Sequence, residues 1–126
     1  MSSSNVLDLV VFTTGSDSAV NTGTGNELGS IGWRLAPGIS VNTLSGDDAI
    51  TGNGASGGSA ITSGGVGSGL NLFGTIDTGP GHDTITGNGG NSPDISGVGG
   101  NGGTGIRLAS TGRISTGSGN DTLNGN

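Results

Sequence analysis

Short stretches in which apolar and polar residues alternate run along most of this chain, and runs of glycine, serine and asparagine separate them. An alternation with a period of two is typical of β-strands that bury one face. No segment of useful length shows the apolar spacing of a helix. The pattern therefore predicts an all-β protein that is built from short strands.

One of these stretches occurs in three copies that share the pattern apolar-x-Thr-x-x-Gly-x-Asp-x-apolar-x-Gly-Asn. The copies occupy residues 41–54, 76–89 and 114–126, so equivalent positions are 35 and 38 residues apart. A weaker copy at residues 20–29 has Glu27 where the others have aspartate. The chain therefore consists of repeat units of about 36 residues.

Two further elements recur upstream of this motif. The first is an apolar-x-apolar triplet, found as Trp33-Arg34-Leu35, Leu70-Asn71-Leu72 and Ile106-Arg107-Leu108. The second is less regular and occupies residues 60–62 and 94–96. Each unit thus has about four short extended stretches. Residues 1–32 then form an N-terminal strand or cap with the degenerate repeat, followed by units at 33–69, 70–105 and, incomplete, 106–126.

Short strands, glycine-rich corners and a fixed long period predict a parallel β-solenoid, that is, a β-helix or β-roll. Equivalent apolar residues would stack on successive turns about 4.8 Å apart. One unit forms either one large turn with three or four faces or two turns of about 18 residues. We favour the large turn because an acidic corner occurs once per unit. The expected ladders are Val41/Ile76/Ile114, Ile50/Ile85/Leu123 and Leu35/Leu72/Leu108.

The composition supports a thin core of this kind. Glycine accounts for 31 of 126 residues, and apolar residues make up only 28% of the chain. Few large side chains are therefore available to offset the entropy lost on ordering the backbone. Disordered chains are usually highly charged, whereas only 10% of these residues are charged and the apolar ones are regularly placed. The sequence therefore favours an ordered repeat fold.

The charge balance excludes some partners. The net charge is −6, lysine is absent, and arginine supplies all three cations. A basic face for nucleic acid or an anionic membrane surface is therefore missing. The chain has no cysteine, so it has no disulfide or thiolate site. Residues 6–14 are apolar but short and interrupted by Asp8, which favours a strand or cap over a secretion signal or membrane span.

Aspartates mark one corner of the expected turns. Asp48, Asp83 and Asp121 would form a column about 5 Å apart, where like charges repel by about 1 kcal/mol even in high dielectric. A hard divalent cation such as Ca²⁺ would offset this repulsion. Asp47 and Asn120 precede two of these aspartates and are candidate extra ligands. The alternative is that local side chain to backbone hydrogen bonds simply cap these turns.

The segments GPGHDTITG and GSGNDTLNG resemble the glycine- and aspartate-rich nonapeptide of repeats-in-toxin (RTX) proteins. The stretch from Gly74 to Gly87 is also similar to RTX-like repeats of cyanobacterial and marine bacterial surface proteins. The resemblance implies a calcium-binding β-roll in a secreted or cell-surface protein. It places the calcium-binding aspartates at Asp83, Asp121 and Asp48, and the turn glycines at Gly79, Gly81, Gly117 and Gly119. This chain departs from the family in having the motif once per unit and in having Leu44 where the first glycine would stand.

We therefore expect a secreted structural module that holds Ca²⁺ and associates end to end into a surface layer, adhesin stalk or filament. A cell-surface polysaccharide is a second expected partner, and neither nucleic acid nor a membrane span is expected. Arg34 and Arg107 are expected to face outward at equivalent positions, paired with Asp77 or Asp94. The unique His82 is expected to be an exposed turn residue.

Two alternative functions remain open at this stage. The carboxylate pairs Asp47/Asp48 and Asp77/Asp83 suit a polysaccharide-acting β-helix enzyme or its accessory module. This alternative is weakened by the scarcity of aromatic platforms for sugars. The threonine rows Thr43/Thr78/Thr116 and Thr51/Thr86 suit an ice- or glycan-binding face, although threonine also favours strands in general. We expect the structural role rather than an enzyme.

Overall fold

The computed structural model describes residues 10–22, 31–55, 67–90 and 103–126, and these residues contain ten strands and no helix. All of their strand pairs are parallel, and they form three sheets, which we name after their middle strands. The β4 sheet contains β1 (Ser18–Thr22), β4 (Ala49–Asn53), β7 (Thr84–Asn88) and β10 (Thr122–Gly125). The β5 sheet contains β2 (Trp33–Leu35), β5 (Leu70–Leu72) and β8 (Ile106–Leu108). The β6 sheet contains β3 (Ser40–Asn42), β6 (Thr75–Asp77) and β9 (Arg113–Ser115).

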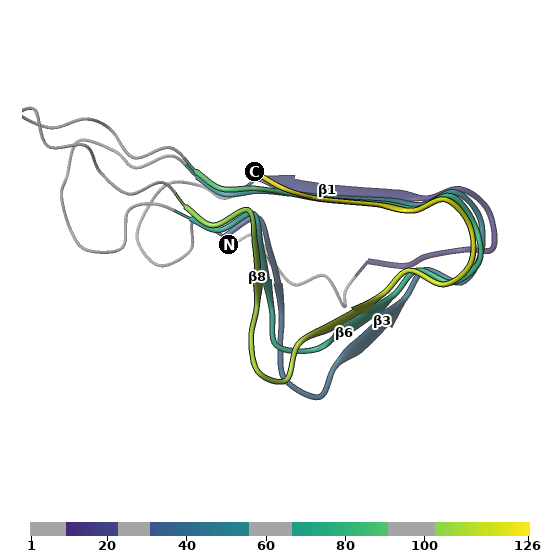
Figure 1. The fold of residues 1–126 in the computed structure, drawn as a ribbon, viewed down its shortest axis with the longest axis horizontal. Helices are drawn as coiled ribbons and strands as arrows, with labels where there is room; N and C mark the ends of the chain where they lie inside the picture. Colours follow the sequence, from purple (N-terminus) through teal and green to yellow (C-terminus); the bar gives the residue numbers. More distant parts are fainter. Residues whose placement is uncertain (1–9, 23–30, 56–66, 91–102) are drawn as a thin grey trace, which may run out of the picture.

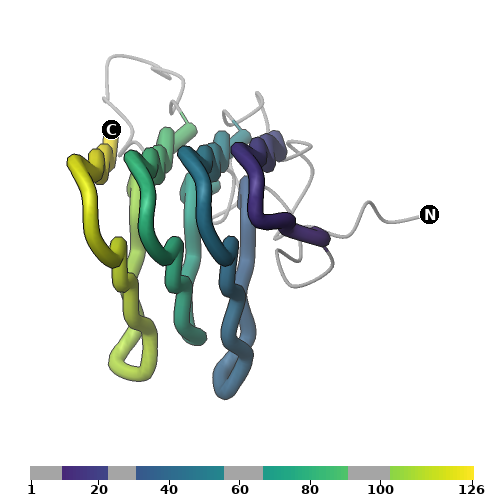
Figure 2. The backbone as a smooth tube through the Cα atoms, turned by 90° about the vertical axis from the view of Figure 1, so that its right-hand side faces the viewer, coloured from purple at the N-terminus to yellow at the C-terminus, as the bar shows by residue number. Residues whose placement is uncertain are grey.

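The three sheets form the sides of a triangle when the molecule is viewed down its shortest axis (Figure 1). Seen from the side, successive passes of the chain lie next to each other in sequence order (Figure 2). Each complete pass enters the β5 sheet, turns into the β6 sheet and then continues into the β4 sheet. The all-β prediction is thus confirmed, and the arrangement is compatible with a parallel β-helix or β-roll.

The strand register pairs the residues that the sequence ladders predicted. Ile50 lies opposite Ile85, and Leu123 follows in the same row. Residues that meet across adjacent passes in the middle of the molecule are 35 to 38 positions apart in the sequence. The inward residues of the two middle passes are fully buried or nearly so, namely Leu35, Val41, Ile50, Leu70, Leu72, Ile76 and Ile85. The predicted apolar ladders are therefore confirmed.

Glycine on the inner face of the β4 sheet is required by a close approach of two chain segments. A Cβ atom on Gly52 would lie 2.2 Å from the carbonyl oxygen of Gly69, which leads into β5. The same holds one pass later, where a Cβ on Gly87 would lie 2.2 Å from the carbonyl oxygen of Gly105. No side chain fits at such a distance. The Gly-Asn pair that ends the sequence motif thus marks the narrow corner between the β4 and β5 sheets.

The N-terminal part of the repeat alignment was wrong. The structure pairs β1 with β4, which places Val20 beside Thr51 in the β4 sheet rather than in the row of Val41. Glu27, the rest of the weak copy, residues 60–62 and 94–96, and residues 6–9 of the expected N-terminal strand lie outside the described residues. Residues 10–14 form no strand, yet Phe12 packs into the hydrophobic core. The described part of each complete pass contains three strands, and the fourth predicted stretch stays a prediction.

Candidate functional site

The aspartates lie where the β6 sheet passes into the β4 sheet. We use the name aspartate corner for residues 43–48, 78–83 and 116–121, which join β3 to β4, β6 to β7 and β9 to β10, together with residues 13–17 before β1. These turns stack closely on one another at the right-hand end of the view in Figure 1. The sequence forms a tight turn here because glycines adopt left-handed backbone angles, with φ of +72° at Gly79 and +70° at Gly117.

The structure brings the three predicted aspartates into one hydrogen-bonded column. The backbone N–H of Asp48 donates to Oδ1 of Asp83 at 2.9 Å, and the N–H of Asp83 donates to Oδ1 of Asp121 at 3.1 Å. Each carboxylate thus accepts a hydrogen bond from the pass before its own. A bond to an ionised acceptor is stronger than a neutral one, so this column ties successive passes together.

Sequence reasoning missed a fourth member of this column. The N–H of Asp17 donates to Oδ1 of Asp48 at 2.9 Å, and the carboxylate of Asp17 accepts from the backbone N–H of Thr13 at 2.6 Å. The sequence signal was present, since Gly-Ser-Asp-Ser-Ala at residues 15–19 matches Gly-x-Asp-x-apolar of the repeat. The separation of 31 residues from Asp48, against 35 and 38 for the later pairs, concealed it.

Two carboxylate oxygens of the column are buried without a partner. Asp48 is 2% exposed and Asp83 is 1% exposed, and the Oδ2 atom of each makes no hydrogen bond. Burying a carboxylate oxygen without a donor or a counter-ion is costly. Among the described residues, these two atoms are therefore buried polar groups whose cost a positive charge would offset. The described residues contain no group of three or more His, Cys, Asp or Glu side chains arranged to hold a metal ion.

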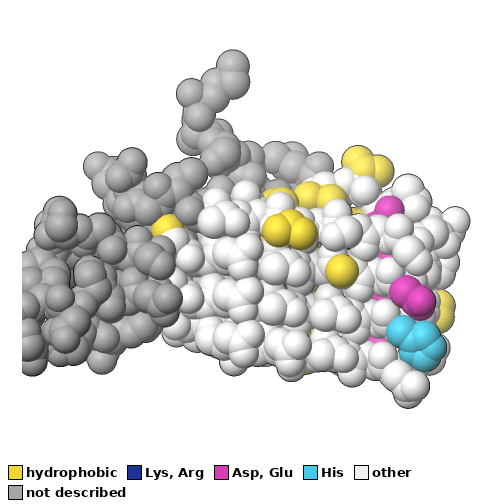
Figure 3. Space-filling model, turned by 90° about the horizontal axis from the view of Figure 1, so that it is seen from above, with side chains coloured by type: hydrophobic (Ala, Val, Ile, Leu, Met, Phe, Trp, Pro, Cys, Tyr) yellow, Lys and Arg dark blue, Asp and Glu magenta, His cyan; other side chains and the backbone are white. Residues whose placement is uncertain are grey.

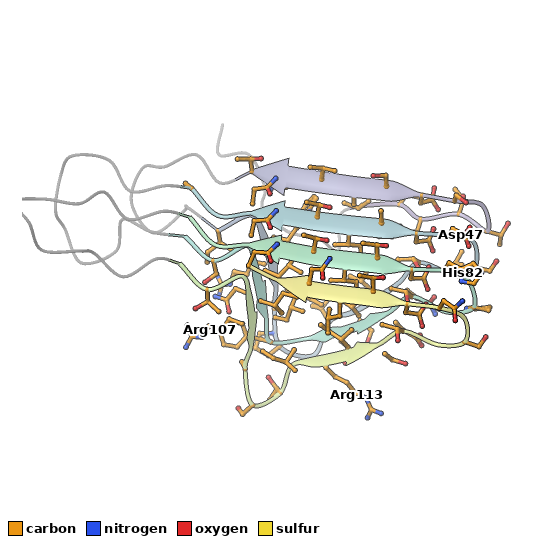
Figure 4. All side chains as sticks on the ribbon, turned by 45° about the horizontal axis from the view of Figure 1, so that its top comes forward. Asp47, His82, Arg107 and Arg113 are labelled. Atoms are coloured by element: carbon orange, nitrogen blue, oxygen red, sulfur yellow. The ribbon has the colours of Figure 1, made fainter. Side chains whose placement is uncertain are left out.

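A second column runs beside the first with its hydrogen bonds in the opposite direction. The N–H of His82 donates to Oδ1 of Asp47 at 2.8 Å, and the N–H of Asn120 donates to Nδ1 of His82 at 2.9 Å. Here the later pass donates to the side chain of the earlier one. Asp47 and His82 lie on successive passes at the exposed corner (Figure 4), where acidic side chains are visible beside a histidine on the surface (Figure 3). His82 is thus an exposed turn residue, as expected, and its imidazole links two passes.

The turn glycines let successive passes approach each other. A Cβ on Gly81 would lie 1.8 Å from the carbonyl oxygen of Gly46, and one on Gly119 would lie 1.6 Å from that of Gly81. Carbonyl groups of one pass therefore face the glycine of the next. Leu44 adopts φ of +75° in the place of the first glycine, where it is 44% exposed. A left-handed conformation costs a residue with a side chain about 1–2 kcal/mol.

The proposed catalytic carboxylate pairs and the threonine rows are partly buried and partly on the surface. Asp48 and Asp83 are buried, so one carboxylate of each proposed catalytic pair is out of reach of a bulky substrate. The expected surface row of Thr43 and Thr78 was wrong, because both are buried and Thr43 Oγ1 donates to the carbonyl oxygen of Thr78 at 2.9 Å. Thr51 and Thr86 do lie side by side on the β4 sheet.

An asparagine ladder was also missed by sequence reasoning. The side-chain amide of Asn88 donates to Oδ1 of Asn53 at 2.8 Å, and that of Asn126 donates to Oδ1 of Asn88 at 2.9 Å. The recurring Gly-Asn pair was the available signal. The ladder joins the passes at the far end of the β4 sheet from the aspartate corner. Each end of this sheet thus carries a column of side-chain hydrogen bonds.

Comparison with known protein families, with curated proteins and with solved structures found no match to this chain. Among the described residues, no helix has the length and apolar character that crossing a membrane requires.

Proposed function

We propose that this chain is a structural β-solenoid module with turns of about 36 residues, which holds Ca²⁺ at the aspartate corner and extends end to end outside the cell. The observation that carries the proposal is the aspartate column, in which Asp48 and Asp83 each bury an unpartnered Oδ2 atom. A module that buries charge between successive passes gains stability when a cation neutralises it.

The donor chemistry of the corner fits calcium. Ca²⁺ prefers carboxylate and carbonyl oxygens and accepts flexible geometry. Asp48 and Asp83 would supply the free carboxylate oxygens, and Asp121 would continue the column. The ion would supply charge neutralisation and no reaction chemistry. The further ligands predicted by the sequence are Asp47, Asn120 and the carbonyl groups of Gly79, Gly81, Gly117 and Gly119.

Replacing Asp83 by asparagine is expected to leave the protein as stable as the wild type, or more stable, without calcium. With calcium, the variant is expected to be less stable than the wild type. The Asp83→Asn variant keeps an oxygen that can accept the Asp48 N–H but loses one charge of the column. In EDTA the variant should melt at the same or a higher temperature than the wild type, because repulsion in the column falls. In millimolar calcium the wild type should become more stable by about 1–3 kcal/mol, and the variant should gain much less.

The Asp77→Asn variant is the matched control for this experiment. The Oδ1 atom of Asp77 accepts the N–H of Gly79 within its own turn, and the side chain lies outside the column. Its calcium response should equal that of the wild type. A wild-type melting curve that is identical in calcium and in EDTA, together with no calcium in elemental analysis, would contradict the calcium proposal.

The two ends of the molecule differ in a way that supports end-to-end association. At the N-terminal end, Phe12 packs onto the core and is 9% exposed. At the C-terminal end, Leu108 and Leu123 belong to the apolar ladders but are 51% and 53% exposed. They expose apolar surface beside strand edges, which readily pair with another chain. A second copy stacked head to tail would cover this surface.

Sedimentation velocity at increasing concentration tests the association. The wild type should form assemblies whose size grows with concentration, and Leu123→Asp should stay monomeric because it places a charge in the interface. Leu44→Asp is the control, since Leu44 is exposed on a corner in the middle of the stack. Equal assembly of the wild type and Leu123→Asp would exclude this end as the interface.

A further inference from the structure

Two of the three cations of this acidic chain lie in one row of the β5 sheet. The register places Arg34 opposite Asn71, and Asn71 opposite Arg107. The alternate residues of these strands, Leu35 and Leu72 among them, point into the core, so the row lies on the outer face. Two strand spacings separate the arginines, which corresponds to about 9.6 Å between their backbones.

The guanidinium groups of this row have no carboxylate partner within the described part of the chain. The expected pairing of Arg34 with Asp77 is not formed, and Asp94 lies outside the described residues. Arg34 instead lies over the ring of Phe73, with Cζ 5.9 Å from the ring centroid. Both arginines are exposed. In a chain with nine acidic residues and three basic ones, this leaves two positive charges available to a ligand.

Asn71 lies between the two arginines and is only 8% exposed. Its Oδ1 atom is buried and accepts no hydrogen bond. A buried acceptor without a donor is rare in folded proteins, because its desolvation is uncompensated. The accessible groups of the row are therefore its two guanidiniums, and the residue between them is buried and uncharged. The ring of half-buried Phe73, beside Arg34, adds an apolar contact.

We propose that the row Arg34–Asn71–Arg107 binds an acidic polysaccharide that carries a carboxylate or sulfate on every second sugar. Two sugar rings of an extended polysaccharide span a length similar to the separation of the arginines. The anionic groups pair with the two exposed guanidiniums, and the uncharged Asn71 adds no competing charge between them. The Phe73 ring accommodates the apolar face of a sugar. The site uses none of the residues of the aspartate corner.

The net charge of −6 opposes the approach of a polyanion, but five of the nine acidic residues lie at the aspartate corner. Arg107 extends from the side of the molecule opposite to the corner that carries Asp47 and His82 (Figure 4). Charges that are separated by more than the Debye length of about 8 Å at physiological salt are largely screened. Of the charges that the described residues carry, those of the two arginines therefore act most strongly at the row itself.

Titration calorimetry with hyaluronan, which has one carboxylate per disaccharide, tests the proposal, with neutral dextran as the comparison probe. The buffer contains EDTA, so that calcium cannot bridge the probe to the aspartate corner. The wild type should bind hyaluronan and not dextran. Arg34→Gln and Arg107→Gln should each weaken binding about tenfold, which is the loss expected for one charge-assisted hydrogen bond.

Arg113→Gln is the matched control, because it removes the same charge from an exposed arginine in the β6 sheet. This variant should bind hyaluronan within twofold of the wild type. Equal weakening by all three variants would overturn the proposal in favour of a general charge effect, and so would the absence of binding by the wild type. Binding that requires calcium would place the ligand at the aspartate corner instead. Circular dichroism of each variant shows that the fold is retained.

Discussion

Replacing Gly81 by alanine is expected to destabilise the protein by about 3 kcal/mol or more, a large share of the roughly 5–15 kcal/mol of a typical domain. The new Cβ atom would lie 1.8 Å from the carbonyl oxygen of Gly46, and backbone cannot yield there as a flexible side chain would. The φ angle of +153° is also one that residues with side chains rarely adopt. Urea denaturation followed by circular dichroism measures the loss.

The control for this variant is Gly38→Ala. Gly38 also has a left-handed φ of +77°, but nothing lies within 4 Å of a Cβ atom built on it. Only the backbone cost of about 1–2 kcal/mol should then apply. A difference between the two variants measures the close stacking of passes at the aspartate corner. If both lost the same stability, the two passes would have to be further apart than the structure shows.

The contacts that repeat between adjacent passes were predictable from the sequence. The apolar ladders and the column of Asp48, Asp83 and Asp121 follow from spacing alone, because parallel strands in register place equivalent residues side by side. The prediction needed only the repeat and the period-two pattern. It did not depend on the shape of the turn.

Features that depart from the repeat could not be predicted from its spacing. Asp17 belongs to the column, but a spacing of 31 residues hides it from an alignment that expects about 36. Leu44 is a second example of a residue that departs from the repeat. It occupies a glycine position, and its side chain is tolerated there because it is exposed to solvent. Whether such a departure is tolerated depends on the space beside the residue in the neighbouring pass. The repeat pattern in the sequence does not predict this space.

The direction of some residues near the corners was misread from the sequence. Thr43 and Thr78 look like surface threonines, yet the alternation that buries Val41 and Ile76 continues to them and turns them inward. Gly52 looks like a turn residue and instead lies on the inner face of β4, against the backbone before β5. The period of two thus gives the direction of all three residues, and it was their polar or turn-forming character that misled the prediction.

At the aspartate corner, both columns of hydrogen bonds join each pass to its neighbour. In one column Asp83 accepts from the earlier pass, and in the other His82 donates its N–H to Asp47 of the earlier pass and accepts from Asn120 of the later one. A pass therefore cannot slide along its neighbour without breaking bonds of both directions. These hydrogen bonds therefore fix the register of the corner at which the proposed cation would bind.

Replacing Ile85 by alanine is expected to cost about 3–5 kcal/mol, which would unfold a substantial fraction of a marginally stable module. Ile85 is 0% exposed and lies between Ile50 and Leu123 in its ladder. Its neighbours in the core are fixed by the strand ladders on either side, which limits how far they can move to fill the cavity. Thermal unfolding at a concentration below any self-association measures the loss.

Leu123→Ala is the control within the same ladder. Leu123 is 53% exposed at the C-terminal end, so its truncation removes less buried surface and should cost about 1 kcal/mol or less. Raising the concentration into the range of assembly should increase the cost of Leu123→Ala and leave that of Ile85→Ala unchanged, because stacking buries only the end residue. Equal costs for the two variants at low concentration would mean that Ile85 does not lie in a continuous core, and the ladder would have to be redrawn.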